Sequence, residues 1–187
     1  MILHIKNMVC NRCIMVVTQQ LENIGLNVMQ INLGSVTVQP DPDSEQLTLV
    51  SSQLKLLGFE LLDNVKDQMV DRIKSLIIEK VHHSDLADTH LNFSQYLSDG
   101  LKKDYAYLSR LFSDAEDITI EKFIIQQKIE KVKELLEYGQ LNLNEITWKM
   151  GYSSSAHLST QFKAITGLTP SQFKSSGQGQ RAPIDKI

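Results

Sequence analysis

Two short apolar helices around a glycine, near the end of the sequence, constrain the fold more than any other feature. Ile146 and Met150 lie four residues apart and predict the inner face of a short helix. Gly151 follows, and a glycine supplies the positive φ angle that a tight turn needs. Leu158 and Phe162 are again four residues apart and would pack a second helix. The pattern predicts a helix-turn-helix unit, which lays its second helix in the major groove of DNA.

Capping residues mark the helix boundaries of this region. Ser153 or Ser154 stands directly before the second helix, where a serine side chain can accept a hydrogen bond from the first turn. Thr169 and Pro170 combine an N-cap residue with a proline at the first helical position. A further helix is therefore predicted from residue 170.

A long helix is predicted over Thr119–Tyr138, with Gly139 ending it. At 1.5 Å per residue it would span roughly 30 Å. Its inner side comprises Phe123, Ile124, Ile129, Val132, Leu135 and Leu136. The sequence shows no convincing internal repeat on inspection.

Residues 67–174 resemble the DNA-binding domain of the AraC/XylS family of bacterial regulators. The stretch 141–174 carries the most specific part of the resemblance, and the segment Tyr107-Leu-Ser-Arg-Leu-Phe112 matches the family's first recognition helix. The resemblance implies a seven-helix fold in which one long helix holds two helix-turn-helix units apart. One DNA turn is about 34 Å, so the two recognition helices would enter successive major grooves on one face of the duplex.

The resemblance also implies which side chains contact DNA. Arg110 is the strongest single candidate, because arginine can hold guanine through two hydrogen bonds. The implied base contacts are Ala106, Ser109 and Arg110 in the first unit, and Ser155, Ala156, Ser159 and Thr160 in the second. Candidates for phosphate contact are Lys102, Lys103, Lys149 and Lys163, with helix N-termini assisting.

Two positions depart from the family's pattern. Lys102 stands in the first turn where the family usually has glycine, and is expected to strain or reshape that turn. Thr160 stands where a long basic or polar residue is common, so base reading there is expected to be weaker or different. Trp148 and Tyr152 are expected to be packing residues.

The first 63 residues predict the order β-α-β-β-α-β, as in ferredoxin-like folds. The expected strands are 2–6, 27–33, 36–39 and 59–62. One helix is expected to end near Ile24 and Gly25, and Asp43 or Ser44 would cap a second that runs to Leu57. The two helices would cover one face of a four-stranded sheet.

A Met8-Val-Cys10-Asn-Arg-Cys13 loop precedes the first of these helices. The loop and the element order resemble heavy-metal-associated domains, in which the two cysteines bind a soft ion, usually Cu(I). Thiolates suit Cu(I), and the start of a helix favours the charged form of a thiol. Met8 is assigned to the core and Phe59 to shielding the loop. Asn7 and Val9 depart from the common Gly-Met-Thr-Cys form without removing a ligand.

Two alternatives remain for this cysteine pair. It could be a redox pair of the thioredoxin type, although the longer strand-helix arrangement and the Trp or Pro usual beside such cysteines are missing. It could also belong to a domain that binds no metal. His82, His83 and His90 could supply imidazole ligands, but a polar connecting loop over 82–90 is the favoured interpretation.

Charge lies unevenly along the chain, whose net charge is −3. Residues 1–89 hold 7 Lys and Arg against 11 Asp and Glu, whereas residues 90–187 hold 12 against 11. The basic groups thus lie towards the predicted DNA-binding part, and affinity would depend on where they point. The sequence shows no signal peptide and no membrane-spanning run, and its cysteines are not scattered as in a disulfide framework, so a cytoplasmic location is expected.

The sequence therefore predicts an α+β chain. A ferredoxin-like domain over 1–63 would precede an all-α domain over 64–174 with two helix-turn-helix units, and 175–187 would be a flexible tail. The predicted function is a sequence-specific transcription regulator, with a soft metal at Cys10 and Cys13 as its candidate signal. A metal-trafficking or metal-buffering protein whose helical domain binds a protein is the alternative. The expected partner is double-stranded DNA and RNA polymerase is a further candidate; no enzyme motif or membrane partner is indicated, and the oligomeric state stays open.

Overall fold

The computed structural model describes residues 1–84, 86, 92–176 and 181–187. It divides into two compact units, Met1–Leu76 and Ile77–Ile187. The division falls inside helix α3, Val65–His83. The first part of α3 thus belongs to the N-terminal unit and its last part to the C-terminal unit. The domain boundary predicted after residue 63 stays a prediction. Each unit is described by itself below.

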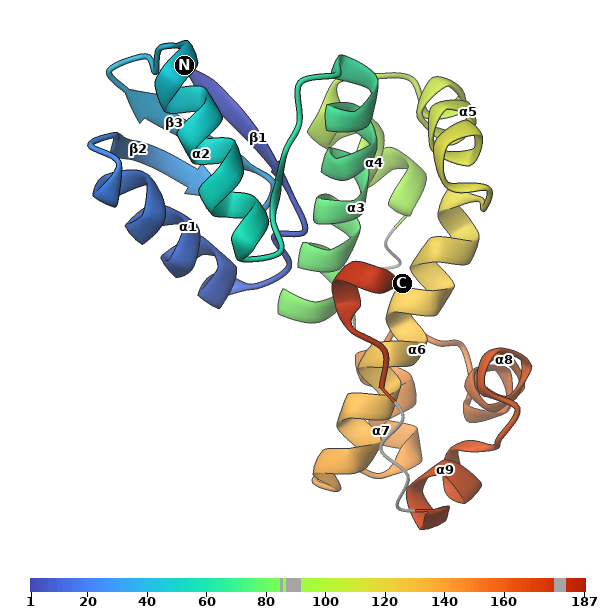
Figure 1. Cartoon of the computed structure of the whole chain (residues 1–187). Coiled ribbons are helices and arrows are strands. Elements are labelled where there is room, and N and C mark those ends of the chain that lie inside the picture. The colour runs from blue at the N-terminus through green and yellow to red at the C-terminus, as the bar shows by residue number, and fades with distance from the viewer. Residues whose placement is uncertain (85, 87–91, 177–180) are drawn as a thin grey trace. The chain divides into compact units, whose positions relative to one another are not determined.

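The N-terminal unit contains a four-stranded antiparallel sheet in the order β2-β3-β1-β4, with two further helices (Figure 1). Its elements before α3 are β1 (Ile2–Lys6), α1 (Asn11–Asn23), β2 (Asn27–Asn32), β3 (Ser35–Gln39), α2 (Ser44–Leu56) and β4 (Glu60–Leu61). These bounds agree with the predicted ones to within about two residues. Asp43 is the N-cap of α2 and forms a capping box with Gln46.

One core holds the sheet and both helices together. Leu3 and Ile5 alternate with less buried residues along β1, so one face of the strand is apolar. The same buried cluster includes Val17 and Leu21 of α1 and Val50 of α2. Both helices therefore cover the same face of the sheet.

The C-terminal unit is helical in the residues that the structure describes. After the end of α3 come α4 (Phe93–Leu101), α5 (Tyr105–Glu116), α6 (Ile120–Tyr138), α7 (Leu143–Lys149), α8 (Ser155–Thr166), α9 (Pro170–Ser176) and a 3₁₀ turn (Ile184–Lys186). The predicted long helix is α6, with Thr119 as its N-cap and Gly139 as its C-cap. Of its predicted inner side all but Leu135 are buried: Phe123, Ile124, Ile129, Val132 and Leu136.

The loop predicted over 82–90 is wrong at its start, because His82 and His83 continue α3. His82 is buried, and its Nε2 lies 2.8 Å from Oε1 of Gln127 in α6. This contact satisfies one polar ring atom and stabilises the last turn of the helix. His90 lies outside the described residues, so a ligand role for it is not tested.

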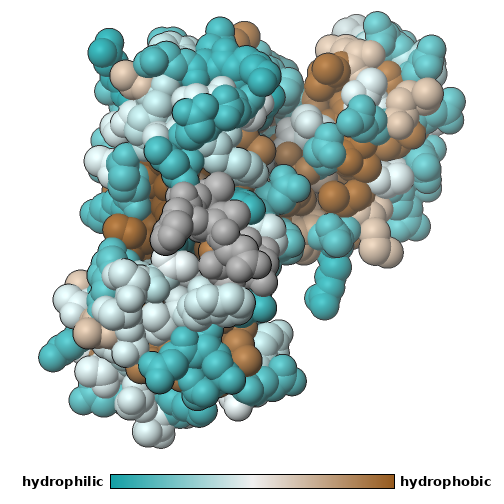
Figure 2. Space-filling view, turned by 180° about the vertical axis from the view of Figure 1, so that it is seen from behind, coloured by the Kyte–Doolittle hydropathy of each residue, from teal (hydrophilic) through white to brown (hydrophobic). Residues whose placement is uncertain are grey.

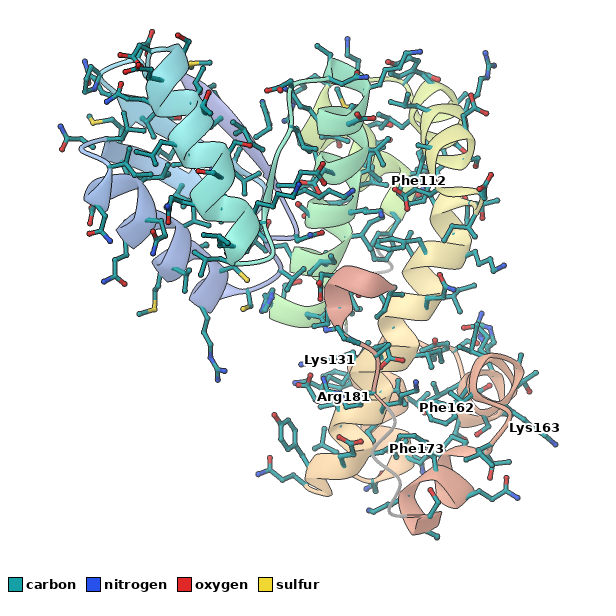
Figure 3. The ribbon with its side chains drawn as sticks, viewed as in Figure 1. Phe112, Lys131, Phe162, Lys163, Phe173 and Arg181 are labelled. Carbon is teal, nitrogen blue, oxygen red and sulfur yellow. The ribbon has the colours of Figure 1, made fainter. Side chains whose placement is uncertain are left out.

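The described part of the C-terminal segment contacts α6. Arg181 forms an ion pair with Glu134 at 2.9 Å, and the backbone N–H of Ala182 donates to Glu130. Gln127 donates to the carbonyl of Ile184. Figure 3 shows Arg181 beside α6. Among the described residues, none of the helices has the length and hydrophobicity to cross a bilayer.

Candidate nucleic-acid interface and cysteine pair

Two helix-turn-helix units flank α6 in the chain: α4 with α5, and α7 with α8. Each turn passes through one left-handed residue, Lys102 at φ +54° in the first and Gly151 at φ +66° in the second. Each second helix then begins at a side-chain cap. Asp104 accepts from the backbone N–H of Ala106 at 2.9 Å, and Ser154 accepts from His157 at 3.1 Å. The prediction of Ser153 or Ser154 as the cap is resolved in favour of Ser154.

The two units are related by an internal repeat that sequence inspection missed. Helices α5 and α8 have 12 residues each and begin fifty residues apart. The shift continues into the N-caps of the following helices, Thr119 and Thr169. At this shift the identical pairs are Ala106/Ala156, Leu108/Leu158, Ser109/Ser159, Phe112/Phe162, Thr119/Thr169 and Phe123/Phe173.

Equivalent phenylalanine pairs anchor α5 and α8. The rings of Phe112 and Phe123 lie 5.5 Å apart between α5 and α6. The rings of Phe162 and Phe173 lie 5.5 Å apart between α8 and α9. Figure 3 shows Phe162 and Phe173 facing one another. Since both pairs are buried, each recognition helix is held by the same apolar contact.

Four of the seven predicted base-contacting residues lie on the exposed side of these helices. Leu108 and Phe112 of α5 are fully buried, so the opposite side faces solvent. The same arrangement recurs in α8. Ala106, Arg110, Ala156 and Thr160 are exposed, whereas Ser109, Ser155 and Ser159 are half-buried. The structure brings the predicted residues together on each helix, and their contact with bases stays a prediction.

Thr160 differs from its counterpart Arg110 in reach and in bonding. Its hydroxyl donates to the carbonyl of Ala156 at 2.9 Å, within its own helix. The side chain is short and its donor is already used, so it has little left to offer a base except its acceptor lone pairs and its methyl group. Weaker or different base reading at Thr160 stays a prediction.

The residues predicted to contact phosphates lie on both helix-turn-helix units. Lys102 and Lys103 are exposed at the turn before α5, Lys149 is half-buried at the end of α7, and Lys163 is exposed on α8. Figure 3 shows Lys163 pointing away from the packed side of α8. The surface over the second unit, in the lower part of Figure 2, is mainly hydrophilic. An exposed, polar surface with lysines suits contact with phosphates.

Two residues of the outer faces were not predicted. His157 is exposed in the first turn of α8, and Tyr107, its counterpart in α5, is 50% exposed. The ring of His157 packs edge-on against Tyr152. Alignment of α5 with α8 at the fifty-residue shift places Tyr107 and His157 at the same position, so the repeat would have identified both as residues of the outer faces. Each has a ring with polar atoms that could reach a phosphate or a base.

Trp148 does not pack as predicted. Its side chain is 61% exposed, because it lies on α7 opposite the buried Ile146 and beside the outer surface of the second unit. Tyr152 does pack: its hydroxyl is buried without a hydrogen-bond partner among the described residues. Burial raises the pKa of Tyr152 to about 12.

The cysteine pair lies in the N-terminal unit at the start of α1. Cys10 is the N-cap residue and Cys13 follows in the first turn, and their Sγ atoms are 3.6 Å apart without a disulfide. Burial raises the pKa of Cys10, but the backbone N–H of Cys13, its thiol and Arg12 outweigh it, so the pKa lies below its usual value. Burial and the neighbouring Cys10 thiol hold the pKa of Cys13 above its usual value. The pair therefore divides into a more acidic and a less acidic thiol.

The loop that carries the cysteines is held by a hydrogen bond from Asn7 and by the buried side chain of Met8. Asn7 has a left-handed φ of +72°, which asparagine tolerates better than most residues, and its amide donates to the carbonyl of Gly58. Met8 is buried, as predicted. Asparagine is therefore compatible with the left-handed conformation at this position.

Comparisons with known proteins assign the helical part of the chain. Residues 97–176 match the helix-turn-helix domain family. The Msm operon regulatory protein of Streptococcus mutans is 32% identical over 69 residues, and the Xylose operon regulatory protein of Haemophilus influenzae is 27% identical over 99 residues. These matches cover 37% and 53% of this chain, but only 25% and 26% of the two relatives.

A solved structure supports the same assignment. The C-terminal domain of AraT, a response regulator from Geobacillus stearothermophilus, superposes with a TM-score of 0.51 at 25% identity. The match covers 58% of this chain and 84% of that domain. The chain therefore contains an AraC/XylS-type helix-turn-helix domain, and the relatives it matches are regulatory proteins.

Proposed function

We propose that this protein is a sequence-specific DNA-binding transcription regulator of the AraC/XylS type. The repeated helix-turn-helix carries the proposal. Two recognition helices fifty residues apart are each capped, anchored by a phenylalanine pair and exposed on the opposite side. Such a helix with a polar outer face is suited to a DNA major groove.

The two units would divide DNA recognition between them. Arg110 of α5 would hold a guanine through two hydrogen bonds, whereas the short side chains of α8 would read bases by close contact. Lys102, Lys103, Lys149 and Lys163 would bind phosphates and fix the register. The 19 residues of α6 span about 28 Å at 1.5 Å per residue, which is near the spacing of successive major grooves.

Selection of duplexes from a random pool with the full-length chain tests this function. The selected duplex should bind more tightly than random DNA, and both affinities should fall steeply with salt, because phosphate contacts release counterions. Arg110→Ala should lose about 1–3 kcal/mol of preference at one base pair. Lys103→Ala should instead weaken binding to all sequences alike. Absence of any preferred duplex would favour the alternative, a metal-trafficking or buffering protein whose helical domain binds a protein partner.

The cysteine pair supports a second role for the N-terminal unit, response to a soft metal such as Cu(I). The sheet order β2-β3-β1-β4 with two helices on one face supports a ferredoxin-like domain of the heavy-metal-associated kind. The described residues contain no group of three or more His, Cys, Asp or Glu suited to a metal. Two thiols fit a soft ion that accepts two ligands better than Zn²⁺, whose structural sites take four.

The metal role is tested by titrating the full-length protein with Cu(I) under reducing conditions. One ion should bind, and the double variant Cys10→Ser, Cys13→Ser should not bind it while it keeps the wild-type circular dichroism spectrum. Tight binding that survives in the double variant would exclude the thiolates as ligands. RNA polymerase as a partner and a cytoplasmic location stay part of the proposal.

A further inference from the structure

One lysine of α6 contacts both helix-turn-helix units. Lys128 is half-buried, and its Nζ donates to the carbonyl of Met150 at 3.0 Å. Met150 is the C-cap residue of α7, directly before the left-handed Gly151. Lys128 therefore binds the peptide from which the turn of the second unit begins.

The same ammonium lies over two aromatic rings. Nζ is 5.2 Å from the ring centroid of Tyr152, in the turn of the second unit. It is 5.9 Å from the ring centroid of Phe93, the first residue of α4 in the first unit. Both distances fall within the range of cation–π attraction, which is stronger where water is excluded. Burial lowers the pKa of Lys128, as expected for a largely desolvated ammonium.

A close backbone approach occurs beside this cluster. A Cβ added to Gly151 would lie 3.2 Å from the carbonyl oxygen of Leu86, which precedes α4 in the chain. Leu86 is itself buried. Gly151 therefore serves the turn in two ways, through its φ angle and through the space that it leaves for the backbone of Leu86.

We propose that Lys128 is a positioning residue that fixes the placement of the second helix-turn-helix unit relative to the first. The inference rests on the proposed function for its consequence, since the distance between the recognition helices determines which spacing of the two half-sites the protein accepts. A single ammonium that holds Met150, Tyr152 and Phe93 restricts the turn of one unit against the first helix of the other.

The variant Lys128→Met tests the proposal, because methionine keeps an unbranched apolar chain and removes the charge and the donors. Lys131→Met is the matched control, since Lys131 is also half-buried on α6 but pairs with Glu134 at 2.7 Å. Phe93→Leu removes one ring of the cluster without removing its apolar volume. It replaces Lys128→Met if that variant does not fold.

The first measurement needs no DNA. Spin labels are placed at Asp114→Cys and Ala164→Cys, two exposed positions of α5 and α8, in a full-length chain with Cys10→Ser and Cys13→Ser. Lys128→Met should broaden or shift the distance distribution between the labels, whereas Lys131→Met should leave it unchanged. An unchanged distribution for Lys128→Met and Phe93→Leu would overturn the proposal.

The second measurement uses selected duplexes whose two half-sites are moved apart or together by one or two base pairs. Wild type and Lys131→Met should prefer one spacing, and Lys128→Met should lose at least fivefold of that preference. A lower affinity with an unchanged spacing profile would show that Lys128 only stabilises the fold. If wild type binds no duplex preferentially, the proposed function fails, and the label distances alone decide the role of Lys128.

Discussion

At the scale of single residues, backbone conformation explains two departures that the sequence already shows. Asn7 and Lys102 both adopt a positive φ angle, a conformation that favours glycine. The strain expected at Lys102 from the sequence is therefore located at φ +54°. A position that needs a positive φ angle can be predicted from sequence, because the preference for glycine there depends on local sterics alone.

Replacing Lys102 by glycine should stabilise the protein. A left-handed conformation costs a residue with a Cβ roughly 1–2 kcal/mol, and glycine costs about 0.5–1 kcal/mol in chain entropy. The net gain for Lys102→Gly should be about 1 kcal/mol in the free energy of unfolding, measured with urea. If Lys102 contacts a phosphate, the variant should also bind every duplex more weakly, with a smaller dependence on salt.

Asp117 and Gly167 supply the controls for Lys102. They occupy equivalent left-handed positions at the ends of α5 and α8, at φ +56° and +77°. Asp117→Gly should stabilise by a similar amount without loss of DNA affinity. Gly167→Ala should destabilise by about 1 kcal/mol, since a Cβ there meets no atom within 4 Å and only the φ angle resists it. If all three variants have the same free energy of unfolding as the wild type, backbone strain at these positions does not affect stability.

His82 should make stability depend on pH in the acid range. Burial lowers the pKa of His82 to about 4, assisted by Lys131 and His83 and opposed by Gln127 and Glu134. The unfolded chain, with a histidine pKa near ~6.5, binds more protons between those values, so stability rises with pH there. The contribution is complete above pH ~6.5 and is lost as pH falls towards 4, on the order of 3 kcal/mol.

The variant His82→Gln separates this titration from that of other groups. Glutamine can still donate to Oε1 of Gln127 but carries no titrating ring. Urea unfolding between pH 4 and 8 should show a flatter profile for His82→Gln than for wild type. Parallel profiles for the two proteins would show that His82 does not titrate differently in the folded state.

At the scale of elements, the repeat shows what sequence inspection could and could not find. The strands, α6 and the second unit were predicted because their apolar periodicity and caps are local signals. The repeat was missed because its few identities sit mostly at buried, half-buried or capping positions. Among the exposed positions of α5 and α8, only Ala106 and Ala156 are identical. The turns also differ in length. The N-cap Asp104 comes two positions after the left-handed Lys102, whereas the N-cap Ser154 comes three positions after the left-handed Gly151.

Tertiary contacts account for the elements that were predicted wrongly. His82 and His83 follow a polar pattern typical of a loop, but Gln127 of α6 gives His82 a buried partner. Trp148 is large and apolar, yet Ile146 and Met150 already fill the inner side of α7. The partner of His82 cannot be read from the local sequence. The inner side formed by Ile146 and Met150 can be, and the same helix periodicity leaves Trp148 on the outside.

The equivalent caps of the repeat should contribute equally. Thr119 accepts a hydrogen bond from the backbone N–H of Lys122 at 3.2 Å, and Thr169 accepts one from Gln172 at 3.3 Å. Thr119→Ala and Thr169→Ala should each lower the free energy of unfolding by about 1 kcal/mol. Thermal or urea unfolding measures both. A loss confined to one variant would show that the two caps are not equivalent in energy.

At the scale of the whole molecule, net charge is a poor guide to function. The chain carries −3 overall, and its C-terminal part is nearly neutral. In the proposed function, DNA affinity depends on the local placement of lysines and arginine around α5 and α8. The residues of the candidate DNA surface were implied by the resemblance to the AraC/XylS family, and their contacts with DNA stay a prediction. The contacts of Lys128 could not be predicted, since they join segments that lie far apart in sequence.

The last prediction concerns the N-terminal and C-terminal units together. Cu(I) bound to the cysteine pair should change the affinity of the protein for the selected duplex. Only Leu62, Asp63 and Asn64 separate β4 from α3, and the division between the two compact units falls within α3. A coupling of about 1–3 kcal/mol corresponds to ~5–150-fold in affinity. Coupling is reciprocal, so saturating DNA should change the Cu(I) affinity by the same factor.

Duplex affinity of the full-length protein decides this prediction when it is measured apo, Cu(I)-loaded and in the variant Cys10→Ser, Cys13→Ser. The loaded protein should differ from the other two, and the variant should not respond to Cu(I). The Cu(I) affinity is then measured with and without the duplex, as a check that both factors agree. Identical duplex affinities in all three samples would leave the N-terminal unit without a sensing role, while the DNA-binding function of the C-terminal unit would stand unchanged.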